Sequence, residues 1–304
     1  MAEEIGDLDG VGSTTAEKLN KLGFDSLGDL AKGDASVAAD SDVSLSEDRL
    51  QDIIEQASAE AIVIQTGNEV QQEYDERPSV PSGIPSLDEK IGGFESRSLI
   101  AVGGSTGAGK TQLAFQAAGK AVQEFDKPAI YIETEPDRYR GKRVVDMFDE
   151  ETQSMVHKVG VAGEDALDMQ YRAYKAVQEQ YDDASIVVVD SFTSRFRLAT
   201  QFDGRESLGT RNQEFSRHLQ ALESMAIDLE CPVLLCCQVY PSPTQYGTTD
   251  VIYGSSLMMH MVNYVVKMTT SGGQLSNLKV QNHPEYGDFE LPVQILEEGL
   301  VDAE

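Results

Sequence analysis

A glycine-rich string, GSTGAGKT at residues 104–111, limits the folds open to this chain more than any other part of its sequence. It fits the pattern G-x-x-x-x-G-K-[ST] and lies between an expected strand at 99–102 and an expected helix. In that context the backbone N–H groups turn inward around phosphates, Lys110 reaches the β and γ oxygens, and the Thr111 hydroxyl ligates magnesium. The sequence therefore predicts a P-loop that binds ATP with Mg²⁺, and a purely structural glycine turn is the alternative.

Strands and helices alternate through most of the chain after the P-loop. The expected strands are continuous apolar runs at 99–102, 129–132, near 159, 186–189 and 233–237, with long helices at about 164–181 and 207–229. This pattern predicts an α/β fold with a mostly parallel sheet covered on both faces. The segments 261–269, 275–281 and 289–295, with a Gly272-Gly273 turn, predict an antiparallel C-terminal extension.

Acidic side chains follow two of the expected strands. IVVVDS ends in Asp190, where an acid can hold magnesium through water beside a P-loop. AIYIETE ends in Glu133 and Glu135, at the carboxyl edge where open α/β sheets bind ligands. Alternation places these two carboxylates on one side of the strand. Either could polarise the water that attacks the γ-phosphate, or be a solvated loop acid.

Residues 1–60 predict a small helical domain with a hairpin at Gly10 and Gly12. Two helices joined by a G-x-G hairpin expose backbone N–H groups that suit a DNA phosphate, as in a helix-hairpin-helix motif. Lys18 and Lys21 are the nearby cations, and a helical bundle that contacts protein is the alternative.

A linker is expected at 61–83, because it contains Pro78, Pro81 and Gly83, and the ATPase core is expected at 84–304.

The charge balance is strongly acidic: 52 acidic against 24 basic residues give a net charge of −28 and a pI near 4.4. Such a charge strains a compact fold in dilute buffer, so it favours a salt-rich cytoplasm, as in a halophile, over an ordinary cytosol. No run approaches the ~18 apolar residues of a membrane helix, and the N-terminus is acidic rather than basic and apolar. We expect a cytoplasmic protein with no membrane partner.

Several blocks together resemble the archaeal RadA and eukaryotic strand-exchange recombinases, which belong to the RecA-like ATPase superfamily. The resemblance covers nearly the whole chain and rests on SLDEKIGGF, GSTGAGKTQ, IYIETEPDRYRGKR, IVVVDSFTSRFR, PVLLCCQV and LPVQILEEGLVD. It implies a RecA-like core behind a helix-hairpin-helix domain, acting in DNA recombination and in the repair of DNA damage.

The same resemblance implies roles for single residues. Glu135 falls on the catalytic glutamate, and Gln238 falls on the glutamine that senses the γ-phosphate. An arginine that stacks on adenine falls among Arg138, Arg140 and Arg143, of which we take Arg140. The nucleotide contacts then come from Gly104, Ser105, Thr106, Gly107, Ala108, Gly109, Lys110, Thr111 and Gln112.

Two loops are expected to bind single-stranded DNA. The first spans 195–211 and offers Arg195, Arg197, Arg205 and Arg211. Residues 195–217 hold five arginines and three acids, a balance of +2 in a chain of −28. Salt-bridged arginines on a solvated helix are the alternative. The second loop runs from about 240 to 255, where Tyr246 and Tyr253 could stack on bases or only pack.

One family feature is missing from the sequence. No phenylalanine lies between Phe24 and Phe94, so the F-x-x-A motif that links subunits is absent, unless Ile62 or Ile64 replaces it. The leading hypothesis is a DNA-dependent ATPase that assembles as a homo-oligomer or filament on single-stranded DNA and exchanges strands with double-stranded DNA. The alternatives are a non-polymerising paralogue that binds ATP and a recombinase partner, and a KaiC-like signalling ATPase.

Overall fold

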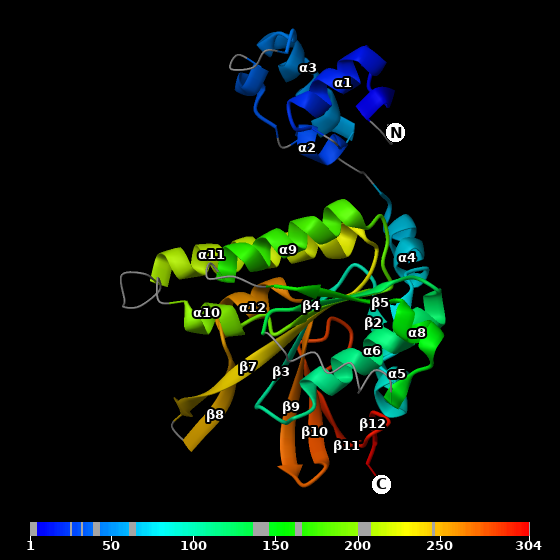
Figure 1. Cartoon of the computed structure of the whole chain (residues 1–304), viewed down its shortest axis with the longest axis vertical. Coiled ribbons are helices and arrows are strands. Elements are labelled where there is room, and N and C mark those ends of the chain that lie inside the picture. Colours follow the sequence, from blue (N-terminus) through cyan, green and yellow to red (C-terminus); the bar gives the residue numbers. More distant parts are fainter. Residues whose placement is uncertain are drawn as a thin grey trace. The chain divides into compact units, whose positions relative to one another are not determined.

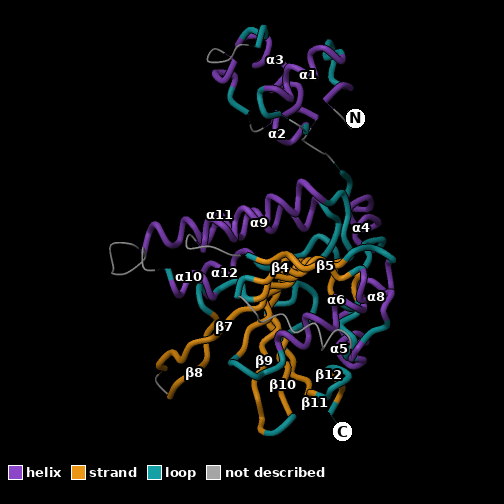
Figure 2. The backbone as a smooth tube through the Cα atoms, viewed as in Figure 1, coloured by secondary structure: helices purple, strands orange, loops and turns teal. Residues whose placement is uncertain are grey.

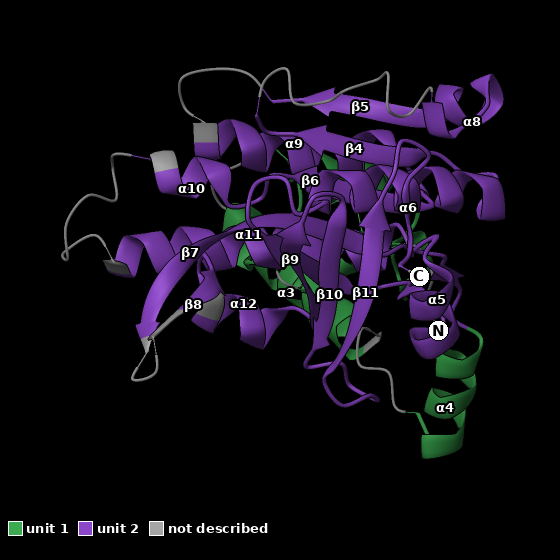
Figure 3. Cartoon of the chain, turned by 90° about the horizontal axis from the view of Figure 1, so that it is seen from below, with its two compact units in different colours: residues 1–76 green, residues 77–304 purple. Residues whose placement is uncertain are grey.

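The computed structural model describes residues 5–24, 26–31, 33–38, 43–60, 65–135, 146–161, 166–199, 208–244 and 247–303. The chain divides into two compact units, unit 1 at Met1–Glu76 and unit 2 at Arg77–Glu304 (Figure 3). None of the described helices is long and apolar enough to cross a membrane.

The described residues of unit 1 form helices joined by turns, with no strand among them. Its elements are η1 (Ile5–Asp7), α1 (Ser13–Lys21), α2 (Leu27–Ala31), η2 (Ala35–Ala38), α3 (Glu47–Glu60) and α4 (Gly67–Asp75). Helix α3 carries apolar residues at helical spacing, and its Leu50, Ile53 and Ala57 are fully buried with Leu19 and Leu30. These side chains form a small core of their own.

Helix α4 lies inside the segment 61–83 that was expected to be a linker. Thr66 and Glu69 form a capping box, in which the Glu69 carboxylate accepts from the Thr66 N–H at 2.7 Å. A capping box satisfies two backbone or side-chain donors at the first turn, so a short polar helix can form without an apolar face against a core. Its described residues include none that is buried.

Unit 2 is built on a large mixed sheet (Figures 1 and 2). Its strands are β3 (Leu99–Gly104), β4 (Ala129–Glu133), β5 (Val156–Gly160), β6 (Ile186–Asp190), β7 (Val233–Thr244), β8 (Gly247–Ile252), β9 (Tyr264–Gly272), β10 (Leu275–Gln281), β11 (Phe289–Ile295) and β12 (Leu300–Asp302). A separate short ladder joins β1 (Ser79–Val80) to β2 (Phe94–Glu95). The helices are α5 (Pro85–Ile91), α6 (Lys110–Phe125), α8 (Glu150–Ser154), α9 (Ala166–Gln180), α10 (Ser194–Leu198), α11 (Leu208–Asp228) and α12 (Ser255–Met261).

The strand order is β12-β11-β10-β9-β3-β7-β6-β4-β5. Strands β5, β4, β6, β7, β3 and β9 are parallel to one another, whereas β10, β11 and β12 continue the sheet antiparallel. This confirms the predicted α/β fold with a mainly parallel centre and antiparallel C-terminal strands. One detail differs, because β9 pairs parallel with β3 on one side and antiparallel with β10 on the other.

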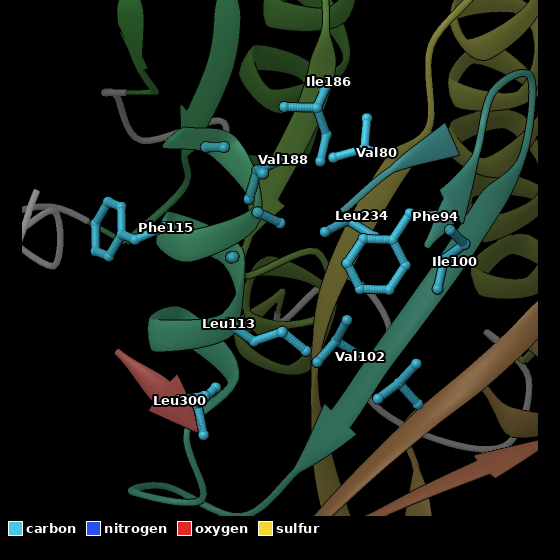
Figure 4. Packing of buried hydrophobic residues seen from close by; sticks show 14 of the residues in the cluster. Val80, Phe94, Ile100, Val102, Leu113, Phe115, Ile186, Val188, Leu234 and Leu300 are labelled. Atoms are coloured by element: carbon cyan, nitrogen blue, oxygen red, sulfur yellow. The ribbon is translucent and has the colours of Figure 1, made fainter. Parts of the chain in front are cut away.

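Apolar side chains cover both faces of the sheet, as the continuous apolar strands predict. Ile100 and Val102 of β3 belong to the cluster under α5 and α6, shown in Figure 4, whereas Leu99 and Ala101 belong to the cluster under α9 and α11. Alternate residues of a strand point to opposite faces, so β3 is buried on both sides. The strand that leads into the P-loop is therefore held rigidly in the middle of unit 2.

The segment from about 240 to 255, expected to be a loop, is mostly a strand hairpin and the start of a helix. Strand β7 continues to Thr244 and pairs antiparallel with β8, from Val239 opposite Ile252 to Pro243 opposite Thr248. Backbone pairing along a β-branched run, with Thr249, Val251 and Ile252, explains the difference. Gly254 then precedes helix α12.

Candidate active site

The P-loop joins β3 to α6 and has the backbone that its glycines allow. Gly107 and Gly109 have φ angles of 86° and 106°, in the left-handed region. At Gly104 a Cβ would lie 2.5 Å from the Met268 carbonyl oxygen of the neighbouring strand β9, so only glycine fits there. The glycines thus permit both the left-handed turns of the loop and the close approach of strand β9.

Lys110 points its ammonium back over this loop. Its Nζ donates to the carbonyl oxygens of Gly104 at 2.8 Å and Ser105 at 2.9 Å. An ammonium has three N–H donors, so these two bonds leave one N–H donor available beside the loop. The arrangement suits an anion such as a phosphate oxygen.

Asp190 lies at the end of β6, where two hydroxyl groups meet one of its carboxylate oxygens. Thr111 Oγ1 donates to Asp190 Oδ2 at 2.8 Å, and the Tyr131 hydroxyl donates to the same oxygen at 2.6 Å. Tyr131 is fully buried on β4, and its ring stacks on Phe115 of α6 at 4.7 Å with 12° between the planes. Asp190 is held by both the P-loop helix and a neighbouring strand.

Sequence reasoning missed Tyr131. The signal available was its alternation with Glu133 and Glu135 in the string AIYIETE, which places it on the same face of β4. That face proves to be the α6 side, since Tyr131 belongs to the apolar cluster with Phe115. No pattern in the sequence links it to Asp190.

The structure separates the two glutamates that the strand pattern alone left open and between which the family resemblance indicated Glu135. Glu133 is nearly buried, at 4% exposure, and its Oε2 lies 2.5 Å from Lys158 Nζ of β5. Glu135 lines the cavity beside the P-loop, and its Oε1 accepts from Gln238 Nε2 at 3.1 Å. Glu135 is therefore the glutamate placed where a nucleotide would bind.

Gln238 connects three parts of unit 2. Its backbone N–H donates to Thr193 Oγ1 at 2.9 Å, its amide nitrogen donates to Glu135, and its amide oxygen accepts from the Arg197 guanidinium. Sequence reasoning expected Gln238 near the nucleotide but found no sign of its bond to Arg197.

A cavity of about 380 Å³ lies at this edge of the sheet. Its lining consists of Thr106, Gly107, Gly109, Lys110, Thr111, Gln112, Phe115, Glu135, Asp190, Ser191, Gln238 and Ile295. One cation, two carboxylates and three residues with hydroxyl groups line the cavity beside the loop glycines, and hard oxygen donors of this kind fit Mg²⁺ bound with phosphates. The residues present therefore fit a magnesium nucleotide. Gln112 is almost buried, and its amide nitrogen lies 3.3 Å from Met147 Sδ.

The arginines expected to contact DNA have different surroundings. Arg195 donates to the carbonyl oxygens of Thr134 at 2.5 Å and Val161 at 2.8 Å. Burial lowers its pKa, and the charge of Glu135 acts in the opposite direction. Arg197 is exposed on α10 and contacts Gln238. The Arg195 side chain is thus committed to the interior, whereas Arg197 reaches the surface.

Arg211 and Tyr253 contact each other. The Arg211 guanidinium lies 5.6 Å from the Tyr253 ring centroid, and its NH1 group lies 3.4 Å from the Tyr253 hydroxyl. The Tyr253 ring also packs against Phe215 at 6.5 Å. Arg140 with Arg138 and Arg143, and also Arg205 and Tyr246, fall outside the described residues.

In unit 1, the hairpin before α1 has an arginine beside it. Gly10 has a φ of 71°, and its carbonyl oxygen accepts from Arg49 of α3 at 2.9 Å. Lys18 donates to the Ser44 carbonyl oxygen at 2.9 Å. Gly12 precedes α1 as its N-cap. Arg49 was missed because it is 39 residues from Gly10 in the sequence.

A comparison with protein-family models finds a match to the one described as Rad51 over residues 78–303. The matched range holds the P-loop, Glu135, Asp190, Gln238 and the C-terminal strands, and it covers well over half of the chain.

Proposed function

This chain belongs to the Rad51 family of RecA-like recombinases, and on that basis we propose that it is a DNA-dependent ATPase of homologous recombination and DNA repair. It would bind single-stranded DNA and promote homologous pairing and strand exchange. The ATPase part of this proposal rests on one observation. A single cavity is lined by Lys110, Thr111, Glu135, Asp190 and Gln238. The family membership carries the DNA part.

Each residue of this group has a proposed role in ATP hydrolysis. Lys110 binds the γ-phosphate, Thr111 and Asp190 hold Mg²⁺, and Glu135 orients the attacking water and accepts its proton. Bound with ATP, Mg²⁺ supplies positive charge at the β- and γ-phosphates. Gln238 bonds to Glu135 and would detect whether the γ-phosphate is present. The adenine contact is assigned to Arg140 on the family resemblance alone.

The proposed DNA contacts lie in both units. Arg197, Arg211 and Tyr253 would meet single-stranded DNA in unit 2, through phosphate contacts and base stacking. Arg195 remains a prediction that requires its guanidinium to leave two carbonyl oxygens. In unit 1, Gly10 and Gly12 would bind a phosphate of double-stranded DNA as a helix-hairpin-helix motif.

Within the Rad51 family, we propose that this chain is related to the archaeal RadA-like proteins and comes from a cell with a salt-rich cytoplasm. The net charge of −28 supports this part of the proposal, because a charge of that size suits a high-salt cytoplasm. ATPase and DNA assays therefore belong in molar KCl.

The test measures ATP hydrolysis by the purified protein with and without single-stranded DNA, together with strand exchange between a single strand and a homologous duplex. We expect hydrolysis that DNA stimulates, and loss of hydrolysis in Lys110→Ala. Lys120→Ala, on the same helix but outside the cavity, is the matched control and should behave as wild type. Hydrolysis at the normal rate by Lys110→Ala would overturn the ATPase assignment.

A second candidate function is supported by the missing F-x-x-A motif. With no phenylalanine between Phe24 and Phe94, the protein could act as a non-polymerising paralogue that binds ATP and a recombinase partner. Electron microscopy with single-stranded DNA and a non-hydrolysable ATP analogue separates the two. Regular filaments favour the recombinase, whereas monomers, rings or partner-dependent assemblies favour the mediator. The Rad51 match makes the KaiC-like alternative the weakest.

A further inference from the structure

Helix α10 and the residue before it touch the candidate active site through three side chains. Thr193 accepts from the Gln238 backbone N–H at 2.9 Å. Arg195 donates to the Thr134 carbonyl oxygen, next to Glu135 in the sequence. Arg197 donates to the Gln238 side-chain oxygen. A short helix that carries one exposed arginine, Arg197, is therefore bonded directly to the residues around Glu135.

These three contacts differ in how easily a ligand could break them. Thr193 is fully buried, and Arg195 is half-buried against two carbonyl oxygens. Arg197 is exposed, so its guanidinium can exchange the Gln238 oxygen for another acceptor without unpacking the core. A phosphate is a stronger acceptor for arginine than a neutral amide, because both partners are then charged.

The partners of Gln238 determine which way its amide faces. A guanidinium offers donors alone, so it requires the amide oxygen, and the Glu135 carboxylate as an acceptor requires the amide nitrogen. With Arg197 in place, the amide nitrogen is directed at Glu135 Oε1. Without Arg197, only the bond to Glu135 still determines which way the Gln238 amide faces.

We infer that Arg197 is a positioning residue, which holds the Gln238 amide against Glu135 until a DNA phosphate takes its guanidinium. The inference rests on the proposed function and names the group through which DNA would act on hydrolysis. While the Gln238 N–H occupies Glu135 Oε1, that oxygen has one fewer acceptor position for the attacking water. Release of Arg197 lets the amide turn away, and Glu135 can then engage the water.

The experiment compares steady-state ATP hydrolysis of wild type, Arg197→Ala and Arg197→Lys in molar KCl, without DNA and with saturating single-stranded DNA. Loss of one hydrogen bond of about 1 kcal/mol predicts a rate without DNA that is roughly fivefold higher in Arg197→Ala. The ratio of the rates with and without DNA should fall towards one. Arg197→Lys keeps the positive charge and N–H donors but lacks the planar guanidinium fork, so its rate without DNA should lie between those of wild type and Arg197→Ala.

Arg172→Ala is the matched control, because it removes the same charge from an exposed arginine of α9 that pairs with Asp168. It should keep both the rate without DNA and the stimulation by DNA. Thermal unfolding of each variant checks that the fold is intact. A purely structural role for Arg197 would lower the unfolding temperature and leave the stimulation ratio unchanged.

The outcomes distinguish this inference from the proposed function. An Arg197→Ala rate without DNA equal to that of wild type overturns the inference, whether or not DNA stimulates the wild type. A wild type that hydrolyses ATP but ignores DNA overturns the DNA-dependent function, and the comparison without DNA still decides the role of Arg197.

Discussion

Glu133 and Glu135 are only two residues apart, but their side chains have different surroundings. Glu133 is paired with Lys158 on the neighbouring strand, whereas Glu135 lies at the cavity with Gln238. Alternation along a strand predicts the face of a side chain but not its distance from a ligand. The strand β4 ends at Glu133, so Glu135 is already in the segment that turns over the sheet edge.

We expect Glu135→Gln to lower ATP hydrolysis by about 100-fold, because it removes a general base without changing the size of the side chain. Nucleotide binding should persist, as followed with a fluorescent ATP analogue. Glu133→Gln is the matched variant and should hydrolyse ATP at a rate close to wild type. The reverse pattern would transfer the catalytic assignment to Glu133.

Tyr131 is expected to orient the carboxylate of Asp190. Tyr131→Phe keeps the ring on Phe115 but removes the hydroxyl donor to Asp190 Oδ2. A hydrogen bond to a charged group contributes about 1.5–3 kcal/mol, and a part of this should appear as weaker Mg²⁺ binding, roughly fivefold or more. The measurement is a titration of Mg²⁺ against binding of the fluorescent ATP analogue.

The exposed Tyr240 provides a control for that experiment, since Tyr240→Phe removes a hydroxyl from the hairpin surface. It should leave the Mg²⁺ titration unchanged. Equal midpoints for Tyr131→Phe and wild type would show that the hydroxyl does not position Asp190.

At the scale of elements, α6 is attached to the rest of unit 2 by a buried glutamine. Gln116 Nε2 donates to the carbonyl oxygens of Ser82 at 3.2 Å and Leu300 at 3.0 Å, and its Oε1 accepts from the Leu300 N–H at 2.6 Å. The P-loop helix is thereby joined both to β12 and to the segment before α5.

Gln116→Leu should lower the free energy of unfolding by about 2–4 kcal/mol, because several buried backbone groups lose their partner. Chemical denaturation in KCl measures this loss. Gln123→Leu, on the exposed side of the same helix, should change stability little. If both variants lost a similar free energy of unfolding, the hydrogen bonds of Gln116 would make no specific contribution to stability.

Helices α9 and α11 enclose a buried histidine. His218 is fully buried, and its ring meets the rings of Tyr171, Tyr174 and Phe196 at 5.0–5.5 Å. Burial, and to a smaller extent the charge of Arg217, lower its pKa to about 4, while the charge of Asp168 acts in the opposite direction. The helix pair is therefore packed around a neutral imidazole.

Because this pKa lies below that of an unfolded histidine, the unfolded state binds the extra proton first as pH falls. The free energy of unfolding should decrease by about 3 kcal/mol between pH 6.5 and pH 4 through this group. We expect His218→Leu to flatten the pH dependence of unfolding in that window, as measured by denaturant titrations at several pH values. Equal slopes for variant and wild type would contradict the assignment.

At the scale of the whole molecule, the excess of acid over base should make stability depend on salt. The screening length is about 10 Å at 0.1 M salt and about 3 Å at 1 M, so added KCl weakens repulsion among the carboxylates. We expect the unfolding temperature to rise steeply between 0.1 M and 2 M KCl. Sucrose at matched osmolality does not screen charge, so it should raise the unfolding temperature much less than KCl does. A temperature that KCl leaves unchanged would contradict this reading of the charge.

Much of the architecture could be predicted from local patterns. The P-loop follows from glycines at fixed spacing, and the strands β3, β4, β6 and the first half of β7 follow from unbroken apolar runs. The expected position of Asp190 follows from its place at the end of such a strand, whereas the place of Gln238 near the nucleotide was implied by the family resemblance. In contrast, the β7–β8 hairpin was expected to be a loop, because its polar and proline residues do not mark a strand by themselves.

The class of fold and the glycine pattern of the P-loop depend on residues that are neighbours along the chain, so both can be predicted without a structure. The tertiary structure decided which side chains meet. Tyr131 reaches Asp190 across 59 residues, and Arg197 reaches Gln238 across 41. Such contacts depend on the register between strands and on the packing of helices over them, and a shift of one residue would turn the same side chains to the other face.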